Sequence, residues 1–159
     1  MTQQIKGFKE ALRELGRIDR ELQKQYKKHG KDLLTPTAKE IKQAFPLKPP
    51  LSGMGRKWTD VRGRQVFPYV GAAVRRSVQV KVYTAKKARG TLSIIIKSPA
   101  AQVLEFGDQG ALTYHFDDMY GRPGRIAWPI VQRDKSRINT EVSRLAGEMS
   151  NIINRRLAQ

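Results

Sequence analysis

The side chains that most often carry chemistry are few and widely spaced in this sequence. The only two histidines, His29 and His115, lie far apart in different predicted elements, and there is no cysteine. Asp117 and Asp118 are adjacent; such a pair could hold a divalent ion in a nuclease, but it more often closes a turn. Glu105, at the end of a predicted strand, could be a general base, yet no His or Lys can be placed beside it.

These spacings predict no catalytic residue, no metal site and no cofactor. A zinc site needs ligands at characteristic spacings, which two isolated histidines do not supply. The sequence also lacks a glycine-rich phosphate loop followed by Lys-Ser or Lys-Thr, and it lacks a nucleophile elbow. We therefore expect a protein that is not an enzyme. A small nuclease is the alternative that the acidic pair leaves open.

Positive charge is the dominant global property of the chain, whose 159 residues carry a net charge of +17 at pH 7. Residues 61–97 contain nine basic residues and no acidic residue. A segment of one sign repels itself unless something acidic lies near, such as nucleic acid or an acidic face of a neighbouring subunit. The alternative is a solvated surface that keeps the protein soluble. The residues predicted to face a partner or DNA are Arg62, Arg64, Arg75, Arg76, Lys81, Lys86, Lys87 and Arg89.

A long loop is predicted over 46–64, because three prolines and three glycines leave little room for a helix or a ladder. A loop of this length in a small domain is usually functional or ordered by a partner; the alternative is a surface loop without a role. Trp58 lies within it, among basic residues. Because Trp and Arg dominate contact hot spots, Trp58 is the predicted anchor of an interface.

Two amphipathic helices are predicted towards the ends of the chain. Over 3–45, apolar residues recur at helical spacing and form one narrow stripe. Gly30 and the start signal at Thr35–Pro36 leave open whether this region is one bent helix or two. A C-terminal helix with a second apolar stripe is predicted over 129–158, opening at a proline.

Strands are predicted between these helices, over 65–106. Alternating apolar residues over 74–82 and 92–97 predict a β-hairpin with a basic tip at 84–90. An edge strand broken by Pro68 and a short strand over 101–106 bring the total to three or four. The next segment, 107–127, is predicted to be a loop because of its turn-forming residues.

The expected fold class is therefore α+β, with a small antiparallel sheet of three to four strands packed by the long N-terminal helix and the C-terminal helix. The whole chain, 1–159, is expected to be a single domain. No apolar run reaches the length of about 18 residues that a membrane span needs. The N-terminus lacks an apolar signal-peptide core, so the protein is expected to stay where it is made.

The order of elements and several short motifs resemble the siphophage tail-component family, the tail-completion or head–tail joining proteins of the neck. The sequence departs from the family pattern in its longer proline-rich loop and in Val103, where an aromatic residue is expected. The segments that carry the resemblance are IKGFKEALRELGRIDRELQK, Ala44–Phe45–Pro46, the basic strand pair, Val103–Leu104–Glu105–Phe106–Gly107 and Trp128–Pro129.

The resemblance implies a structural virion protein that is assembled in the host cytoplasm and resides in the neck or tail. It would form a homo-oligomeric ring between neighbouring head–tail connector and tail-tube proteins. Ring closure would use a heterologous contact repeated around an axis. The basic hairpin would touch an acidic groove on the next subunit or contact genomic DNA in the channel without reading sequence. The alternative reading of the charge is a free nucleic-acid-binding protein.

Overall fold

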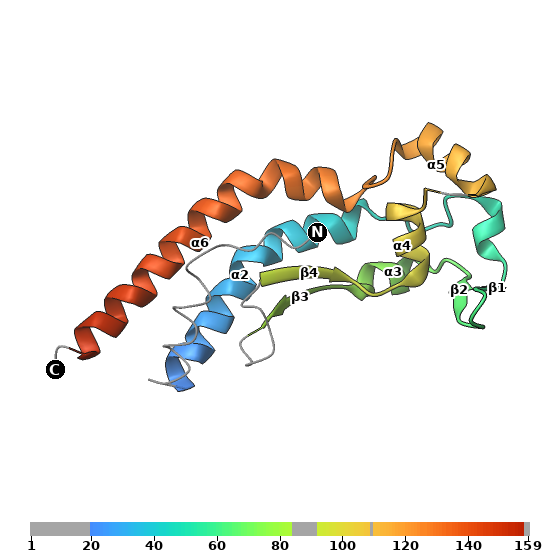
Figure 1. The fold of residues 1–159 in the computed structure, drawn as a ribbon. Coiled ribbons are helices and arrows are strands. Elements are labelled where there is room, and N and C mark those ends of the chain that lie inside the picture. The colour runs from blue at the N-terminus through green and yellow to red at the C-terminus, as the bar shows by residue number, and fades with distance from the viewer. Residues whose placement is uncertain (1–19, 84–91, 109, 158–159) are drawn as a thin grey trace. The chain divides into compact units, whose positions relative to one another are not determined.

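The computed structural model describes residues 20–83, 92–108 and 110–157 (Figure 1). The first part of the predicted N-terminal helix, 3–19, and the predicted hairpin tip lie outside the described residues. In chain order the elements are α2 (Arg20–Ala44), the 3₁₀ turn η1 (Ser52–Gly55), β1 (Trp58–Thr59), β2 (Gln65–Phe67), α3 (Gly71–Ser77), β3 (Val78–Val82), β4 (Leu92–Ile96), α4 (Pro99–Phe106), α5 (Ala111–Tyr120) and α6 (Ala127–Leu157).

The α+β class is confirmed, but the single sheet of three to four strands is not. The described residues form two separate antiparallel sheets of two strands each, β1–β2 and β3–β4. They divide into two compact units. Unit 1 takes its residues from 1–36, 80–94 and 134–159, and unit 2 takes its residues from 37–79 and 95–133.

The helix α2 is continuous through Gly30 and through Thr35–Pro36, where the sequence left open whether one helix or two would form. Pro36 lies inside it, and the hydroxyl of Thr35 donates a hydrogen bond to the Lys31 carbonyl at 2.7 Å instead of starting a second helix. Gly30 does not interrupt the helix either. A Cβ built on it would lie 2.6 Å from the Cδ2 of Leu92, so the glycine lets α2 approach β4 closely.

The C-terminal helix is confirmed as α6, and its apolar stripe lines the core of unit 1. Val142, Leu145 and Met149 follow one another at helical spacing and pack with Tyr26 of α2. Among the described helices, none combines the length and apolar character that crossing a bilayer requires. The partly buried side chains around this core are Leu33, Val82, Leu92, Ile138, Ala146 and Ile152.

The predicted hairpin strands are confirmed only in part, because the first of them begins at Val78 and not at Val74. Residues Gly71–Ser77 are the short helix α3, in which Val74 is buried. Val70, Val74 and Val78 are four residues apart, which is a helical spacing. The first part of the segment predicted as a strand therefore belongs to a helix that leads into β3.

Two further predictions are wrong: residues 101–106 are not a strand, and 107–127 is not simply a loop. Ser98 caps α4 by accepting a hydrogen bond from the backbone N–H of Ala101, and Pro99 opens the helix. The residues of 107–127 include α5, which Gly110 and Gly121 flank with φ of 94° and 84°. These glycines bound a helix, as glycines in left-handed conformations commonly do.

The predicted loop 46–64 contains structure as well, since η1 and β1 lie within it. Trp58 and Thr59 pair antiparallel with Phe67 and Gln65, which forms a second, short sheet. The predicted interruption at Pro68 is confirmed, because β2 ends at Phe67.

Side chains just before and within α3 donate hydrogen bonds to backbone carbonyls at the end of α2 and directly after it. The Tyr69 hydroxyl donates to the Pro46 carbonyl at 2.8 Å, and burial raises the pKa of Tyr69 to about 12. The guanidinium of Arg75 donates to the carbonyls of Gln43 and Phe45 at 3.0 and 2.9 Å. These bonds occupy backbone acceptors that have no partner within the helix at its C-terminus.

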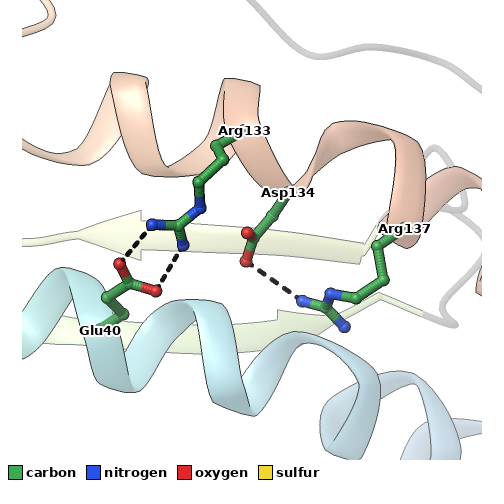
Figure 2. A network of polar contacts seen from close by, with 4 residues as sticks. All are labelled: Glu40, Arg133, Asp134 and Arg137. Carbon is green, nitrogen blue, oxygen red and sulfur yellow. Dashed lines mark hydrogen bonds and ion pairs between the residues drawn. The ribbon is translucent and has the colours of Figure 1, made fainter.

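Within unit 2, α2 is also joined to the start of α6. Both terminal nitrogens of Arg133 donate hydrogen bonds to the carboxylate of Glu40, at 2.8 and 2.6 Å, and form a bidentate ion pair (Figure 2). In unit 1, Arg137 pairs with Asp134 of the same helix at 3.2 Å. Because the side chains of Arg133 and Glu40 are 59% and 43% exposed, we expect their pair to orient the two helices more than to stabilise them.

We expect substitution by alanine to change the free energy of unfolding in opposite directions at Gly71 and at Gly147. A Cβ at Gly71 would lie 2.2 Å from the Leu47 carbonyl oxygen, whereas nothing lies within 4 Å of one at Gly147 in α6. We expect Gly71→Ala to lower the free energy of unfolding by about 2–3 kcal/mol. Gly147→Ala should raise it by about 0.5–1 kcal/mol. Urea titrations measure both, and an unchanged midpoint for Gly71→Ala would contradict this packing.

Candidate interaction surface: the Trp58 hairpin

Residues 56–67, which we call the Trp58 hairpin, form a turn held by one carboxylate. Asp60 accepts hydrogen bonds from the backbone N–H groups of Arg62 and Arg64, at 2.9 and 2.8 Å, and from Nε of Arg64 at 2.7 Å. Backbone bonds from Asp60 N to Arg64 O and from Gly63 N to Asp60 O close the loop. Gly63 has a φ of 74°, a conformation that favours glycine.

These contacts stabilise the ionised form of Asp60. The hydrogen bond from the backbone of Arg64 is the main cause that lowers the pKa of Asp60 below its ordinary value of 3.8, and the Arg64 side chain adds to it. A carboxylate that accepts several N–H bonds is ionised throughout the physiological pH range. We therefore expect the turn to keep its shape without a partner.

The hairpin displays an indole among cations. Trp58 is 52% exposed, and its ring meets the buried Phe67 ring edge to face, with centroids 6.2 Å apart. Val61, at the tip, is fully exposed. The four basic residues of the hairpin, Arg56, Lys57, Arg62 and Arg64, are all exposed. This combination of an anchored aromatic and surrounding cations is typical of a contact surface.

The remaining residues that we predict to face a partner are dispersed. Arg75 is occupied at the end of α2, and Arg76 Nε donates to the Ala72 carbonyl at 3.3 Å on the exposed side of α3. Lys81 lies on β3 with its Nζ 6.0 Å from the centre of the Tyr83 ring. Lys86, Lys87 and Arg89 lie outside the described residues. Their partner contacts stay predictions.

Glu105 has a structural role that the sequence did not reveal. Its side chain is fully buried in α4, and its carboxylate accepts hydrogen bonds from the backbone N–H groups of Ile126, Ala127 and Trp128 at 2.9–3.1 Å. These are the N–H groups at the start of α6, which have no partner within the helix. The negative charge also complements the positive end of the helix dipole. Glu105 thus caps a helix more than twenty residues away along the chain.

Arg125, which the sequence analysis did not identify, completes this arrangement. Its buried guanidinium donates to the carbonyls of Gly121 and Leu104, at 2.8 and 3.1 Å, and to the carboxylate of Asp117 at 2.6 Å. The group also lies over the ring of Phe116, at 5.5 Å from its centre. Arg125 therefore ties α5 to α4. Its only local signal is a position directly after the turn-forming Gly121 and Gly124, which does not distinguish a buried arginine from an exposed one.

The other residues considered for chemistry are not brought together. Asp117 pairs with Arg125, while Asp118 and His115 are exposed on α5. His29 borders a shallow depression of about 420 Å³ in unit 1, where Arg144 lies between Glu141 and Glu148. Within the described residues, no group of three or more His, Cys, Asp or Glu side chains is arranged to hold a metal ion.

Replacing Glu105 tests its role as a cap. Glu105→Ala leaves the buried N–H groups of α6 without their acceptor, so we expect it to lower the free energy of unfolding by about 3 kcal/mol. Glu105→Gln keeps the shape but loses the charge, and we expect a loss of about 1.5 kcal/mol. The exposed Glu141→Ala is the matched control and should change stability by less than about 0.5 kcal/mol. Equal effects of Glu105→Ala and Glu141→Ala in denaturant titrations would refute the cap.

Removing the carboxylate of Asp60 should loosen the hairpin without unfolding unit 2. In a Trp128→Phe background, where Trp58 is the sole tryptophan, we expect Asp60→Ala to lower the fluorescence anisotropy of Trp58. Acidification should act in the same direction. Because the folded pKa lies below 3.8, the contribution of Asp60 is complete above that value and is lost as the pH falls through the lower, folded pKa.

The exposed Asp108→Ala is the control for the Asp60 experiment and should leave the anisotropy of Trp58 unchanged. An anisotropy that is equally high with and without the Asp60 carboxylate would show that other contacts order the turn.

Comparison with known proteins found no relative of this chain. No family model, curated protein or solved structure matches the chain. The surface and its geometry therefore carry the functional argument.

Proposed function

We propose that this chain is a structural virion protein of a tailed phage: a head–tail connector, neck or tail-completion (tail terminator) component. It would form a ring that joins the head to the tail tube. It would act by docking and would need no catalytic residue, cofactor or metal. The resemblance of its motifs to the siphophage tail-component family motivates the position in the virion, and the distribution of exposed apolar side chains supports docking.

That distribution is the observation on which the proposal rests. In the described part of the chain, the large apolar side chains that are exposed all belong to unit 2, whereas the helices of unit 1 bury their apolar stripes against each other. A contiguous exposed apolar patch marks an interaction region, and we infer that some of these side chains form one. They are Leu47, Trp58, Val61, Val70, Phe106, Tyr114, Met119 and Trp128.

Two of the elements that carry these side chains, α5 and the start of α6, are tied to α4 by hydrogen bonds, which favours docking. On α5, Phe116 is buried while Tyr114 and Met119 are exposed, so the helix is anchored through one side chain and presents others to solvent. Trp128 lies in the first turn of α6, where its own backbone N–H is bound by Glu105. A surface that is ordered before it meets its partner loses less conformational entropy on binding.

The alternatives receive unequal support. A nuclease would need a free acidic pair, but Asp117 is engaged by the buried Arg125. A free nucleic-acid-binding protein would use the basic side chains and leave the exposed face of α5 without a role. The docking proposal accounts for α5 and is compatible with a nucleic-acid contact elsewhere on unit 2.

The double substitution Tyr114→Ser/Met119→Ser tests the docking role. Supplied to a phage lacking the gene, the double variant should leave heads and tails separate in electron micrographs of lysates, because the exposed face of α5 has lost its apolar contacts. Asp118→Ser, on the same helix, should join heads to tails as the wild-type chain does, whereas a nuclease dependent on the acidic pair would lose function.

Circular dichroism must first show that both variants are folded. Light scattering during size-exclusion chromatography should show the wild-type chain as a ring, or as a monomer that oligomerises only with its neighbours. Absence of the chain from purified virions by mass spectrometry would overturn the proposal. Normal joining by the double variant would overturn the assigned face.

A further inference from the structure

We propose that the Trp58 hairpin binds single-stranded nucleic acid, with Arg56, Lys57 and Arg62 at the phosphates and Trp58 stacked on a base. Trp58 is one of the exposed apolar side chains of unit 2, but this activity goes beyond the docking role assigned to α5, because it uses a different element and a different chemistry. The docking surface on α5 meets a protein through apolar contacts. The hairpin offers cations around one aromatic ring, which suits a chain of phosphates and bases.

The cations of the hairpin are available to a ligand. Arg64 is the basic residue that pairs with Asp60, while in the described part of the chain no ion pair involves the side chains of Arg56, Lys57 or Arg62. The one carboxylate of the hairpin is already surrounded by donors of its own turn. The surface therefore has a net positive charge that nothing in the hairpin compensates.

A second copy of the chain is a poor source of the missing negative charge. Most of the acidic side chains that the structure describes already contact a partner within the chain. That partner is an arginine or the N-terminus of a helix. With a net charge of +17, two copies repel each other at long range. The engaged acids are Glu40, Asp60, Glu105, Asp117, Asp134, Glu141 and Glu148.

The indole of Trp58 favours a single strand over a duplex. Phe67 contacts the Trp58 ring from one direction, and about half of the side chain is open to solvent. A base can stack on such a ring only if its own face is free, which holds in a single strand and not inside a duplex. The Asp60 turn orders the site beforehand, so little conformational entropy is lost on binding.

Binding of the full chain to fluorescein-labelled oligo(dT) of about 12 nucleotides tests the proposal, with a duplex of equal length and polyglutamate as the other probes. We expect oligo(dT) to bind more tightly than either and to quench Trp58 in the Trp128→Phe background. Trp58→Ala should weaken oligo(dT) binding by about tenfold, and Trp58→Phe should restore most of it.

The charge requirement is tested by the salt dependence of the same binding. Arg56→Gln/Lys57→Gln/Arg62→Gln should reduce the slope of log K against log salt by about 2, since each phosphate contact with a single strand contributes about 0.7. The matched control, Lys27→Gln/Lys28→Gln/Lys31→Gln on the exposed side of α2, removes the same charge and should leave most of the slope intact.

Three results would overturn the inference: equal losses from both triple variants, duplex binding as tight as single-strand binding with no effect of Trp58→Ala, or equally tight binding of polyglutamate. The first would mean that charge acts without a site. The second would mean a contact with phosphates alone, and the third a preference for acidic protein. None of them bears on whether α5 docks in a virion.

Discussion

The carboxylate of Glu105 at the start of α6 is the contact on which much of unit 2 depends. Three backbone N–H groups converge on it from a helix that begins more than twenty residues later. A buried carboxylate is costly unless donors surround it, and buried N–H groups are costly without an acceptor, so each side of the contact requires the other. The backbone of Glu105 also accepts from Gly124 N at 2.6 Å. α4 and the start of α6 are thereby held in one arrangement.

Arg125 extends the same constraint to α5. It binds carbonyls at the ends of α4 and α5 and one carboxylate of the acidic pair, all from a buried position. The exposed side chains of α5 consequently project from a helix that is tied on its inner side. Their exposure is thus a property of an ordered surface, which is why we assign them to docking and not to fraying.

The sequence predicted the elements whose patterns are long and failed where the pattern was short or the contact distant. The stripe of Val142, Leu145 and Met149 extends over several turns, so α6 was predicted correctly. Residues 101–106 were predicted to be a short strand, but the start signal at Ser98–Pro99 and the buried helical face outweighed that preference.

The candidate surface was only partly predictable for a related reason. An exposed Trp among basic residues can be recognised locally, whereas the turn that orders it depends on several bonds converging on Asp60. The cap at Glu105 depends on residues brought together by the tertiary fold, and no spacing rule for neighbouring residues encodes it. Arg125 was missed on the same grounds, because its local sequence is that of an ordinary turn.

The exposed apolar side chains of unit 2 have a consequence for the isolated protein in solution. Such groups adhere to one another when two copies approach, and only the large positive charge opposes that approach. Electrostatic repulsion extends about 10 Å at 0.1 M salt and shortens as salt is added. We therefore expect the free chain to stay dispersed in dilute buffer and to self-associate in concentrated buffer, and any polyanion that neutralises its charge should promote the same association.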